Sequence, residues 1–256
     1  MGLDMHLVRQ RAKGGLRAAA HFVWPSRSLV SGQHHGGEGL IAPEDFAQLT
    51  FLGASGCRQC ALPLESDLGE ASLCGKCAAK PPRWDAARAA LAYDDVSRKL
   101  VLDLKHAGRR DGLSTFANWM TLAARELLDE ADLIVPVPLH YRRLVHRGFN
   151  QSGWLAQALS QRSGVPSKVD ALVRRKPTPS QGGLSAGERW RNVRAAFEVR
   201  PAHLPLIEGK RVILVDDVFT TGATLSACSR ALRRAGASHI SLVVLARVVR
   251  PSDVTI

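Results

Sequence analysis

The chain has 256 residues, and its 35 Lys and Arg against 23 Asp and Glu give a formal net charge of +12 and a pI near 10.2. This length allows one complete α/β domain and a small additional module. The positive charge predicts an anionic partner, either a nucleic acid or a polyphosphate. No run approaches the roughly 20 apolar residues of a membrane helix, and residues 1–17 lack the apolar region of a signal peptide. We therefore expect a cytoplasmic protein with no membrane insertion.

Four of the five cysteines form two Cys-x-x-Cys pairs, Cys57 with Cys60 and Cys74 with Cys77. Cytosolic thiols stay reduced, which argues against disulfides and favours metal binding. The 13 residues between the pairs are slightly fewer than in common four-cysteine zinc sites, but a β-hairpin can bridge them. One pair alone would fit a redox dithiol, whereas two pairs favour one structural Zn²⁺ with a role in folding or interaction. Cys228 is expected in the core rather than as a nucleophile.

The segment after Pro81 and Pro82 alternates between strand and helix patterns. Strands are expected at 84–93, 133–137, 169–173, 212–215 and 240–246. Helices are expected at 97–106, 114–128 and 152–161, and again after residue 224. This order predicts a parallel sheet with helices on its faces. Residues 174–192 form a polar connection that is long for a loop, so they are either a disordered insert or an active-site lid.

The most informative segment joins a buried strand, two carboxylates and a Thr/Gly loop between residues 212 and 224. Asp216 and Asp217 follow the apolar strand, at the edge where open α/β sheets bind ligands. Two neighbouring carboxylates can accept charge-assisted hydrogen bonds from the vicinal hydroxyls of a ribose. The following loop has hydroxyls, a glycine and a helix N-terminus, which together suit a phosphate. Either half alone would fit an ordinary capped turn, but both together predict a ribose phosphate site. The loop residues are Thr220, Thr221, Gly222, Ala223 and Thr224.

This segment resembles the phosphoribosyl pyrophosphate (PRPP) loop of type I phosphoribosyltransferases. Residues 135–140, 147–151 and 178–197 further resemble the ComF/GntX family, so that the resemblance covers roughly the last two-thirds of the chain. That family is associated with DNA uptake in competent bacteria and pairs a zinc-ribbon region with a phosphoribosyltransferase-like domain. The resemblance implies an α/β type I phosphoribosyltransferase fold, with a parallel sheet flanked by helices and a small N-terminal zinc-ribbon module.

The resemblance also implies roles for residues outside the motif. The loop after the 133–137 strand would contact pyrophosphate, and residues 174–192 would form a lid that excludes water from the reaction. Mg²⁺ would bind together with PRPP. The implied pyrophosphate and lid residues are Lys105, Leu139, His140, Arg147, Gln181 and Arg189.

Members of this family often carry a second zinc module, which precedes the four-cysteine site. The residues at its ligand positions in this chain are Ser28, Ser31, Ala42 and Asp45. We therefore expect that module to be metal-free, with one zinc per chain, and to be held, if at all, by apolar contacts of Trp24, Phe46 and Phe51. The implied organisation is a tail at 1–20, a double ribbon region at 21–82 with the cysteine site at 57–77, and a phosphoribosyltransferase domain at 84–250.

Two functions from different classes follow from the resemblance. In the first, an enzyme of nucleoside metabolism uses Asp216 and Asp217 to hold the ribose of PRPP during Mg²⁺-dependent transfer of ribose phosphate to an acceptor. In the second, a non-catalytic PRPP- or nucleotide-binding factor acts in DNA uptake and contacts single-stranded DNA or a helicase partner. The aromatic content of 5% weakens a base-stacking version of the second function. Gluconate-related metabolism rests only on the family's second name.

Overall fold

The computed structural model describes residues 26–36, 40–53, 56–64, 72–106, 110–175 and 196–250. The chain forms two compact units, residues 1–49 and residues 50–256. Within the described ranges, no helix is both long enough and apolar enough to span a bilayer.

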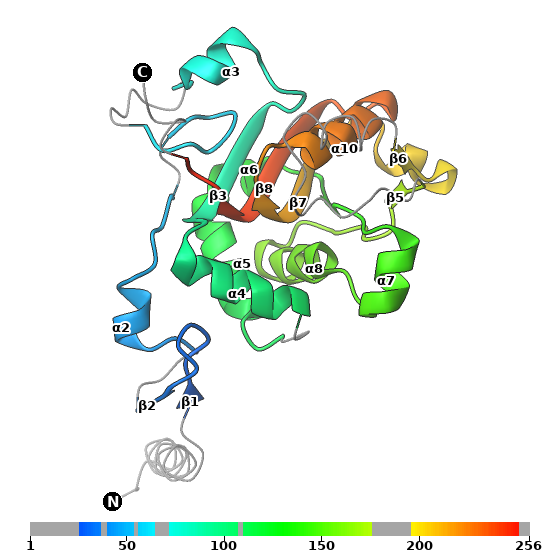
Figure 1. The fold of residues 1–256 in the computed structure, drawn as a ribbon. Coiled ribbons are helices and arrows are strands. Elements are labelled where there is room, and N and C mark those ends of the chain that lie inside the picture. The colour runs from blue at the N-terminus through cyan, green and yellow to red at the C-terminus, as the bar shows by residue number, and fades with distance from the viewer. Residues whose placement is uncertain are drawn as a thin grey trace, which may run out of the picture. The chain divides into compact units, whose positions relative to one another are not determined.

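The larger unit is built on a four-stranded sheet in which all neighbouring strands are parallel, in the order β3-β8-β7-β4 (Figure 1). Its strands are β3 (Ala86–Ala92), β4 (Leu133–Pro136), β7 (Arg211–Phe219) and β8 (His239–Arg247). The β7–β8 register runs from Arg211 opposite His239 to Phe219 opposite Arg247. The carboxyl ends of these strands therefore lie at one edge of the sheet, where open α/β folds bind ligands.

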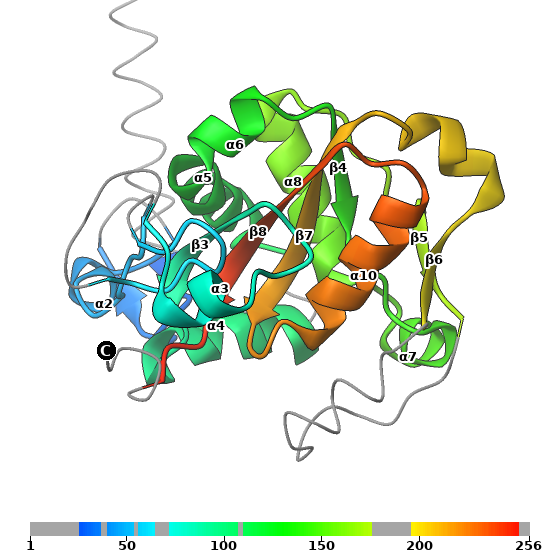
Figure 2. The same ribbon diagram turned by 90° about the horizontal axis from the view of Figure 1, so that it is seen from above.

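Helices cover both faces of this sheet, as Figures 1 and 2 show. The face that lies below the sheet in Figure 1 carries α4 (Asp95–His106), α5 (Leu113–Ala123) and α8 (Gln151–Ser163). The other face carries α10 (Ala223–Arg234). Helix α8 begins where the Asn150 side chain accepts a hydrogen bond from the Ser152 backbone N–H, and it ends at the left-handed Gly164 (φ 79°). The predicted parallel α/β architecture is confirmed.

Three elements differ from the sequence-based expectations. The single helix expected at 114–128 divides at Ala124 (φ −125°, ψ 24°) into α5 and a short α6 (Arg125–Asp129). The basic segment after β4 forms α7 (Tyr141–Arg147). The strand expected at 169–173 is β5 (Leu172–Arg174), which pairs antiparallel with β6 (Phe197–Val199), a strand that the sequence did not predict. A 3₁₀ helix, η1 (Pro201–Leu206), then leads to β7.

The four-cysteine ribbon, residues 56–64 and 72–80 with helix α3 (Gly75–Ala79), belongs to the larger unit. Its buried Cys60 and Cys77 share one hydrophobic core with Trp84 and Phe219. The backbone N–H of Ala87 in β3 donates to the Arg58 carbonyl at 2.8 Å. The four-cysteine ribbon and the segment from residue 84 onward therefore share one core.

The smaller unit pairs β1 (Ser26–Arg27) with β2 (His34–His35) and ends with α2 (Pro43–Phe46). The buried Asp45 carboxylate accepts hydrogen bonds from Ser28 and Ser31, the two serines at positions that the family resemblance assigns to zinc ligands. The Ser31 hydroxyl lies 2.6 Å and its backbone N–H 3.2 Å from Asp45 Oδ2, and the Ser28 hydroxyl contacts the same oxygen. Asp45 is 7% exposed, whereas Phe46 is 48% exposed. The Asp45 contacts therefore accompany the buried apolar residues Leu29, Val30 and Leu49 in this unit. Of the aromatic residues named for it, Trp24 lies outside the described residues, and Phe51 belongs to the larger unit, where the centroid of its ring lies 5.2 Å from that of Trp119.

Candidate functional site

A cavity of about 380 Å³ opens at the carboxyl ends of β4 and β7. Asp216 and Asp217 come from the end of β7, and the threonine loop at the start of α10 forms one side. The loop after β4 and the first residue of α8, Gln151, form the opposite side. Strand, loop and helix ends thus bring carboxylates, hydroxyls and cations together within one space.

The two carboxylates have different hydrogen-bond partners. Asp216 Oδ1 accepts from the Ser152 hydroxyl at 2.8 Å and from the Asp217 backbone N–H at 3.0 Å. Asp217 Oδ2 accepts from Gln151 Nε2 at 3.0 Å and lies 3.1 Å from Lys105 Nζ. Gln151 is itself positioned by Arg147, whose Nη1 donates to its Oε1 at 2.9 Å. Asp217 is therefore paired with a cation, whereas Asp216 is held by neutral donors.

This difference affects the ionisation of Asp216. Burial, followed by the charge of the adjacent Asp217, raises the pKa of Asp216 to about 7. The hydrogen bond from Ser152 and the charge of Lys105 act in the opposite direction. Near neutral pH the carboxyl of Asp216 consequently exchanges between its protonated and ionised forms, and a ligand that needs a carboxylate acceptor will favour the ionised form.

The threonine loop has the geometry of an anion cradle. Gly222 adopts the left-handed conformation (φ 75°) at the position that caps α10. A Cβ atom at Gly222 would lie 2.9 Å from Phe219 Cε2 and 3.0 Å from Trp84 Cη2. Two features therefore require glycine at position 222, namely its positive φ and the aromatic rings packed beneath the turn. The first N–H groups of α10 have no acceptor within the helix, which favours an anion at this end.

Most of the site residues predicted from the sequence line this cavity. They are Lys105, Leu139, Arg147, Asp216, Asp217, Thr220, Thr221, Gly222, Ala223 and Thr224. His140 does not line it: its Nδ1 instead accepts the Arg142 backbone N–H at 3.3 Å and caps α7. Burial, followed by the charge of Arg174, lowers the pKa of His140. Gln181 and Arg189 lie outside the described residues.

Sequence reasoning missed two cations that line the cavity, Arg143 and Arg174. Arg143 lies on α7, in the segment after β4 where a loop was expected. Arg174 ends β5 and is only 8% exposed, and burial lowers its pKa. The sequence did carry one signal for Arg174, which is its position at the end of a short apolar strand. A guanidinium in such a buried position usually has a partner, so an arginine there is a candidate for a binding site.

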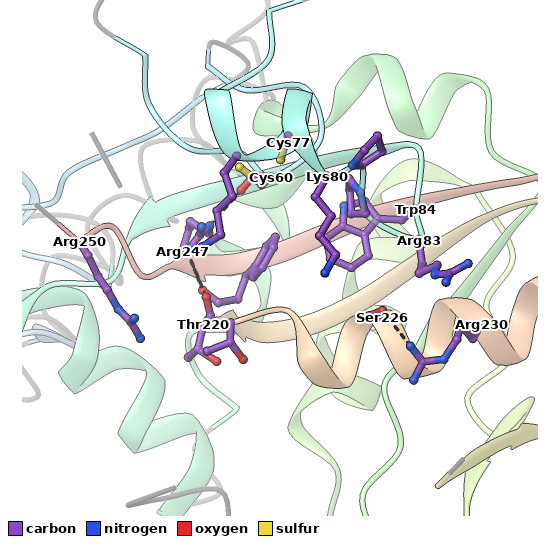
Figure 3. A pocket seen from close by; sticks show the side chains of 15 residues that line it. Cys60, Cys77, Lys80, Arg83, Trp84, Thr220, Ser226, Arg230, Arg247 and Arg250 are labelled. Carbon is purple, nitrogen blue, oxygen red and sulfur yellow. Dashed lines mark hydrogen bonds between the residues drawn. The ribbon is translucent and has the colours of Figure 1, made fainter. Parts of the chain in front are cut away.

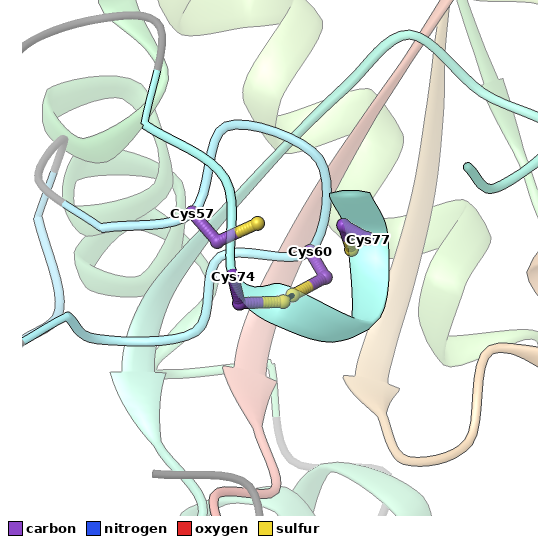
Figure 4. Close-up of side chains that lie close together, drawn as sticks. All are labelled: Cys57, Cys60, Cys74 and Cys77. Carbon is purple, nitrogen blue, oxygen red and sulfur yellow. Dashed lines mark hydrogen bonds between the residues drawn. The ribbon is translucent and has the colours of Figure 1, made fainter. Parts of the chain in front are cut away.

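The four cysteines form a compact cluster (Figure 4). All are buried, and their Sγ atoms lie within 4.8 Å of one another. Cys60 Sγ and Cys74 Sγ are 3.7 Å apart, close to the ~3.8 Å expected across a tetrahedral zinc with 2.3 Å bonds. Hydrogen bonds among the thiols lower the pKa of Cys57 and raise that of Cys60 to about 12. The cluster fits one structural metal ion such as Zn²⁺.

Comparison with known proteins places the chain in a family. Residues 122–253 match the family model described as "Phosphoribosyl transferase domain". The chain is 36% identical over 199 residues to "DNA utilization protein YhgH" of Escherichia coli (strain K12), an alignment that covers 75% of this chain and 84% of that protein. It is 35% identical over 181 residues to "Competence protein F" of Haemophilus influenzae, covering 68% of this chain and 78% of that protein. The chain belongs to the ComF family.

The ComF family also includes the more distant "Competence protein ComFC" of Bacillus subtilis (strain 168), which is 29% identical over 162 residues and covers 62% of this chain and 63% of that protein. For this ComF protein the expected fold class is confirmed. It combines a phosphoribosyltransferase-like domain of the type I class, whose parallel sheet is flanked by helices, with a four-cysteine cluster consistent with a zinc ribbon.

Proposed function

We propose that this ComF protein binds PRPP, or a closely related ribose phosphate, together with Mg²⁺ and transfers the ribose phosphate to an acceptor. The observation that carries the proposal is the cavity that combines the Asp216–Asp217 pair with the threonine loop. Four cationic side chains line the same space, namely Lys105, Arg143, Arg147 and Arg174. One wall therefore suits the hydroxyls of a ribose, and the others suit its phosphate groups.

In this proposal the carboxylates and the cations of the cavity act on different parts of PRPP. The carboxylates of Asp216 and Asp217 accept the ribose hydroxyls and stabilise the positive charge that develops at the anomeric carbon as pyrophosphate departs. We assign to Lys105 and Arg147, which line the cavity, the stabilisation of negative charge on the leaving group. Carboxylate and phosphate oxygens are the ligands that Mg²⁺ prefers, so Asp216 and Asp217 fit this ion, whose charge would offset that of pyrophosphate.

Replacing Asp216 and Asp217 with Asn tests the ribose assignment while keeping side-chain size. The wild-type protein should bind PRPP with micromolar affinity in the presence of Mg²⁺. Loss of two charge-assisted hydrogen bonds should weaken binding by about 3–6 kcal/mol, which is about two to four orders of magnitude in Kd. Titration calorimetry measures both values, and equal affinities would contradict the assignment.

Lys105 supplies a second test with a matched control. Lys105→Ala removes the cation 3.1 Å from Asp217 Oδ2 and should weaken PRPP binding. Lys99→Ala removes the same charge from an exposed position of the same helix, α4, and should leave binding unchanged. A similar loss in both variants would indicate a general effect of net charge rather than a contact in the cavity.

Transfer is tested by release of pyrophosphate from PRPP with a panel of bases, nucleosides and amines. If residues 174–192 act as a catalytic lid, replacing Gln181 and Arg189 with Ala should lower the rate strongly and leave PRPP affinity nearly intact, because a lid acts mainly in the closed transition-state complex. Absence of pyrophosphate release with every acceptor would contradict the enzyme proposal.

The names of two relatives favour a second candidate, a non-catalytic PRPP- or nucleotide-binding factor in DNA uptake that contacts single-stranded DNA or a helicase partner. Those proteins are called "DNA utilization protein" and "Competence protein". The net charge of +12 suits a nucleic-acid backbone. Helix α7 presents an exposed Tyr141 (72%) beside Arg142. PRPP-dependent binding of single-stranded DNA, weakening steeply with salt, in a protein that releases no pyrophosphate would support this candidate over the enzyme.

A further inference from the structure

A second cavity, of about 550 Å³, lies between the four-cysteine ribbon and the threonine loop (Figure 3). One wall is the segment from Lys76 to Trp84, and the opposite wall is the loop after β7 with the first turns of α10. Thr220 and Thr221 line both this cavity and the one described above, whereas Asp216 and Asp217 line only the first. The second cavity therefore lacks the carboxylate pair that suits a ribose diol.

The lining of the second cavity is strongly cationic. No Asp or Glu is among the described residues that line it. The cations are Lys76, Lys80, Arg83, Arg230, Arg247 and Arg250. Lys80 and Arg83 are exposed residues on the ribbon side, and Arg230 faces them from α10, where its Nη1 lies 3.3 Å from the Ser226 hydroxyl. Cations on two opposing walls suit an anion with several oxygens, such as a phosphate or diphosphate.

One of these cations has a structural task instead. Arg247 is 7% exposed, and its guanidinium lies 4.3 Å from the centroid of the Phe219 ring. It donates hydrogen bonds to backbone carbonyls of the ribbon and of the loop after β7, including that of Thr220 at 3.3 Å. Arg247 thus connects the two walls through buried hydrogen bonds, and the cations that we consider for a ligand are the exposed Lys80 and Arg83, with Arg230 on the opposite wall.

The cavity also has an apolar wall. Pro81, Pro82, Trp84 and Phe219 contribute to it. The rings of Trp84 and Phe219 pack edge to face with centroids 5.6 Å apart, and Trp84 Nε1 donates to the Gln59 carbonyl of the ribbon. An inorganic phosphate would leave this wall and most of the volume unfilled. Concave sites that combine apolar walls with a few charged groups typically bind organic ligands. The cationic side chains of this cavity favour an organic ligand that is negatively charged.

We propose that this cavity is a second binding site, for a nucleoside phosphate whose phosphates contact Lys80, Arg83 and Arg230 and whose base lies against the apolar wall. The site is separate from the carboxylate cavity, so its occupation does not depend on ribose phosphate transfer. A free nucleotide and the 5′-phosphorylated end of a nucleic-acid strand present the same chemistry.

The test is the equilibrium binding of a fluorescent ADP, with an N-methylanthraniloyl label on its ribose, to the full zinc-loaded chain. Lys80→Ala combined with Arg83→Ala changes two exposed side chains and should weaken binding about tenfold or more, because phosphate contacts of this kind are charge-assisted. The same variant should bind PRPP as the wild type does. The matched control, Arg200→Ala with Lys210→Ala, removes two exposed cations that line neither cavity and should bind both ligands normally.

A converse variant distinguishes this site from the carboxylate cavity. Asp216→Asn with Asp217→Asn should retain nucleotide binding, and saturating PRPP should change the affinity for the labelled nucleotide by at most a limited factor, because the two cavities share only Thr220 and Thr221. Complete competitive displacement by PRPP, loss of nucleotide binding in the Asn variant, or unchanged binding in the Lys80 and Arg83 variant would each overturn the proposal. If the Asp216→Asn, Asp217→Asn variant loses PRPP binding but keeps nucleotide binding, the result supports the proposed function and leaves the second site intact.

Competing ligands identify the source of the nucleotide. Short DNA oligomers with a 5′-phosphate and with a 5′-hydroxyl compete with the labelled ADP. Competition by the phosphorylated oligomer alone assigns the site to a strand end, and competition by free nucleotide alone assigns it to a small molecule. Equal competition by both oligomers would overturn the proposal, because a terminal phosphate would then not be what the site recognises.

Discussion

The Nε atom of Arg247 donates a hydrogen bond to the backbone carbonyl of Cys60 at 3.0 Å. Cys60 belongs to the four-cysteine cluster, and Arg247 ends β8 beside the threonine loop. The same guanidinium reaches the Thr220 carbonyl. One buried side chain therefore connects the four-cysteine ribbon to the loop that we assign to phosphate.

Removing the metal should consequently affect the loop as well as the ribbon. We expect one zinc per chain by elemental analysis or native mass spectrometry, and Cys74→Ser should release it. Because the ribbon shares a core with Trp84 and Phe219, this variant should lower the melting temperature of the larger unit and weaken PRPP binding. Cys228→Ala, at a buried cysteine outside the cluster, should keep one zinc. Two tightly bound zinc ions per wild-type chain would contradict the metal-free interpretation of the first module.

The raised pKa of Asp216 predicts a pH-dependent affinity. Because an ionised carboxylate accepts stronger hydrogen bonds from ribose hydroxyls than a protonated one does, PRPP binding should strengthen as pH rises through about 7, the pKa of Asp216. The hydrogen bond from Ser152 favours the ionised form, so Ser152→Ala should move the midpoint of this transition to higher pH. Ser160→Ala, on the same helix α8, should leave the midpoint unchanged. The phosphates of PRPP also titrate, but their contribution is the same for the wild type and for every variant. Equal midpoints for the wild type and Ser152→Ala would therefore contradict this role of Ser152.

Gly222→Ala should weaken PRPP binding and lower stability. Its φ of 75° disfavours any Cβ, and that Cβ would lie 2.9 Å from Phe219 and 3.0 Å from Trp84. Positive φ costs about 1–2 kcal/mol, and overpacking adds about 1–3 kcal/mol. Gly209→Ala is the matched control, since Gly209 also has positive φ (71°) but open space around the added atom. Equal effects of both substitutions on unfolding would show that packing beneath the loop is unimportant.

The Asp45 network predicts that the smaller unit depends on one carboxylate. Asp45→Ala leaves the hydroxyls of Ser28 and Ser31 without this acceptor and should destabilise the unit by about 1–3 kcal/mol. Hydrogen exchange of backbone amides in residues 26–49 measures the effect. Glu44→Ala changes an exposed carboxylate in the same helix and should leave the exchange rates unaltered. Unchanged protection in the Asp45 variant would contradict a structural role for the network.

The sequence predicted the sheet and the carboxylate site because both are local patterns. The strand at 212–215, the adjacent carboxylates and the glycine turn follow one another directly, so the geometry of one strand and one turn determines their arrangement. The same holds for the cysteine pairs. The sequence also predicted that Lys105 approaches the site, and the structure places it 3.1 Å from Asp217; that prediction came from a family resemblance.

Residues that depend on tertiary packing were not predictable in this way. Arg174 reaches the cavity because β5 pairs with β6, and that pairing joins segments separated by the long polar connection. The hydrogen bonds of Asp45 depend on how a short loop brings two serines toward a helix. His140 was expected near pyrophosphate through its backbone, and nothing in the sequence indicated that its ring would cap α7. A single sequence shows residue types and their spacing, but it does not show which hydrogen-bond partner a side chain has in the folded protein.

Thr220 and Thr221 line both cavities, and this sharing has a thermodynamic consequence. If a ligand in one cavity shifts the position or the mobility of these two residues, it changes the affinity of the other cavity by some factor. Linkage requires the second ligand to change the affinity of the first by the same factor. Binding measured at one cavity while the other is titrated therefore reports the interaction energy between them, and the two orders of addition must agree.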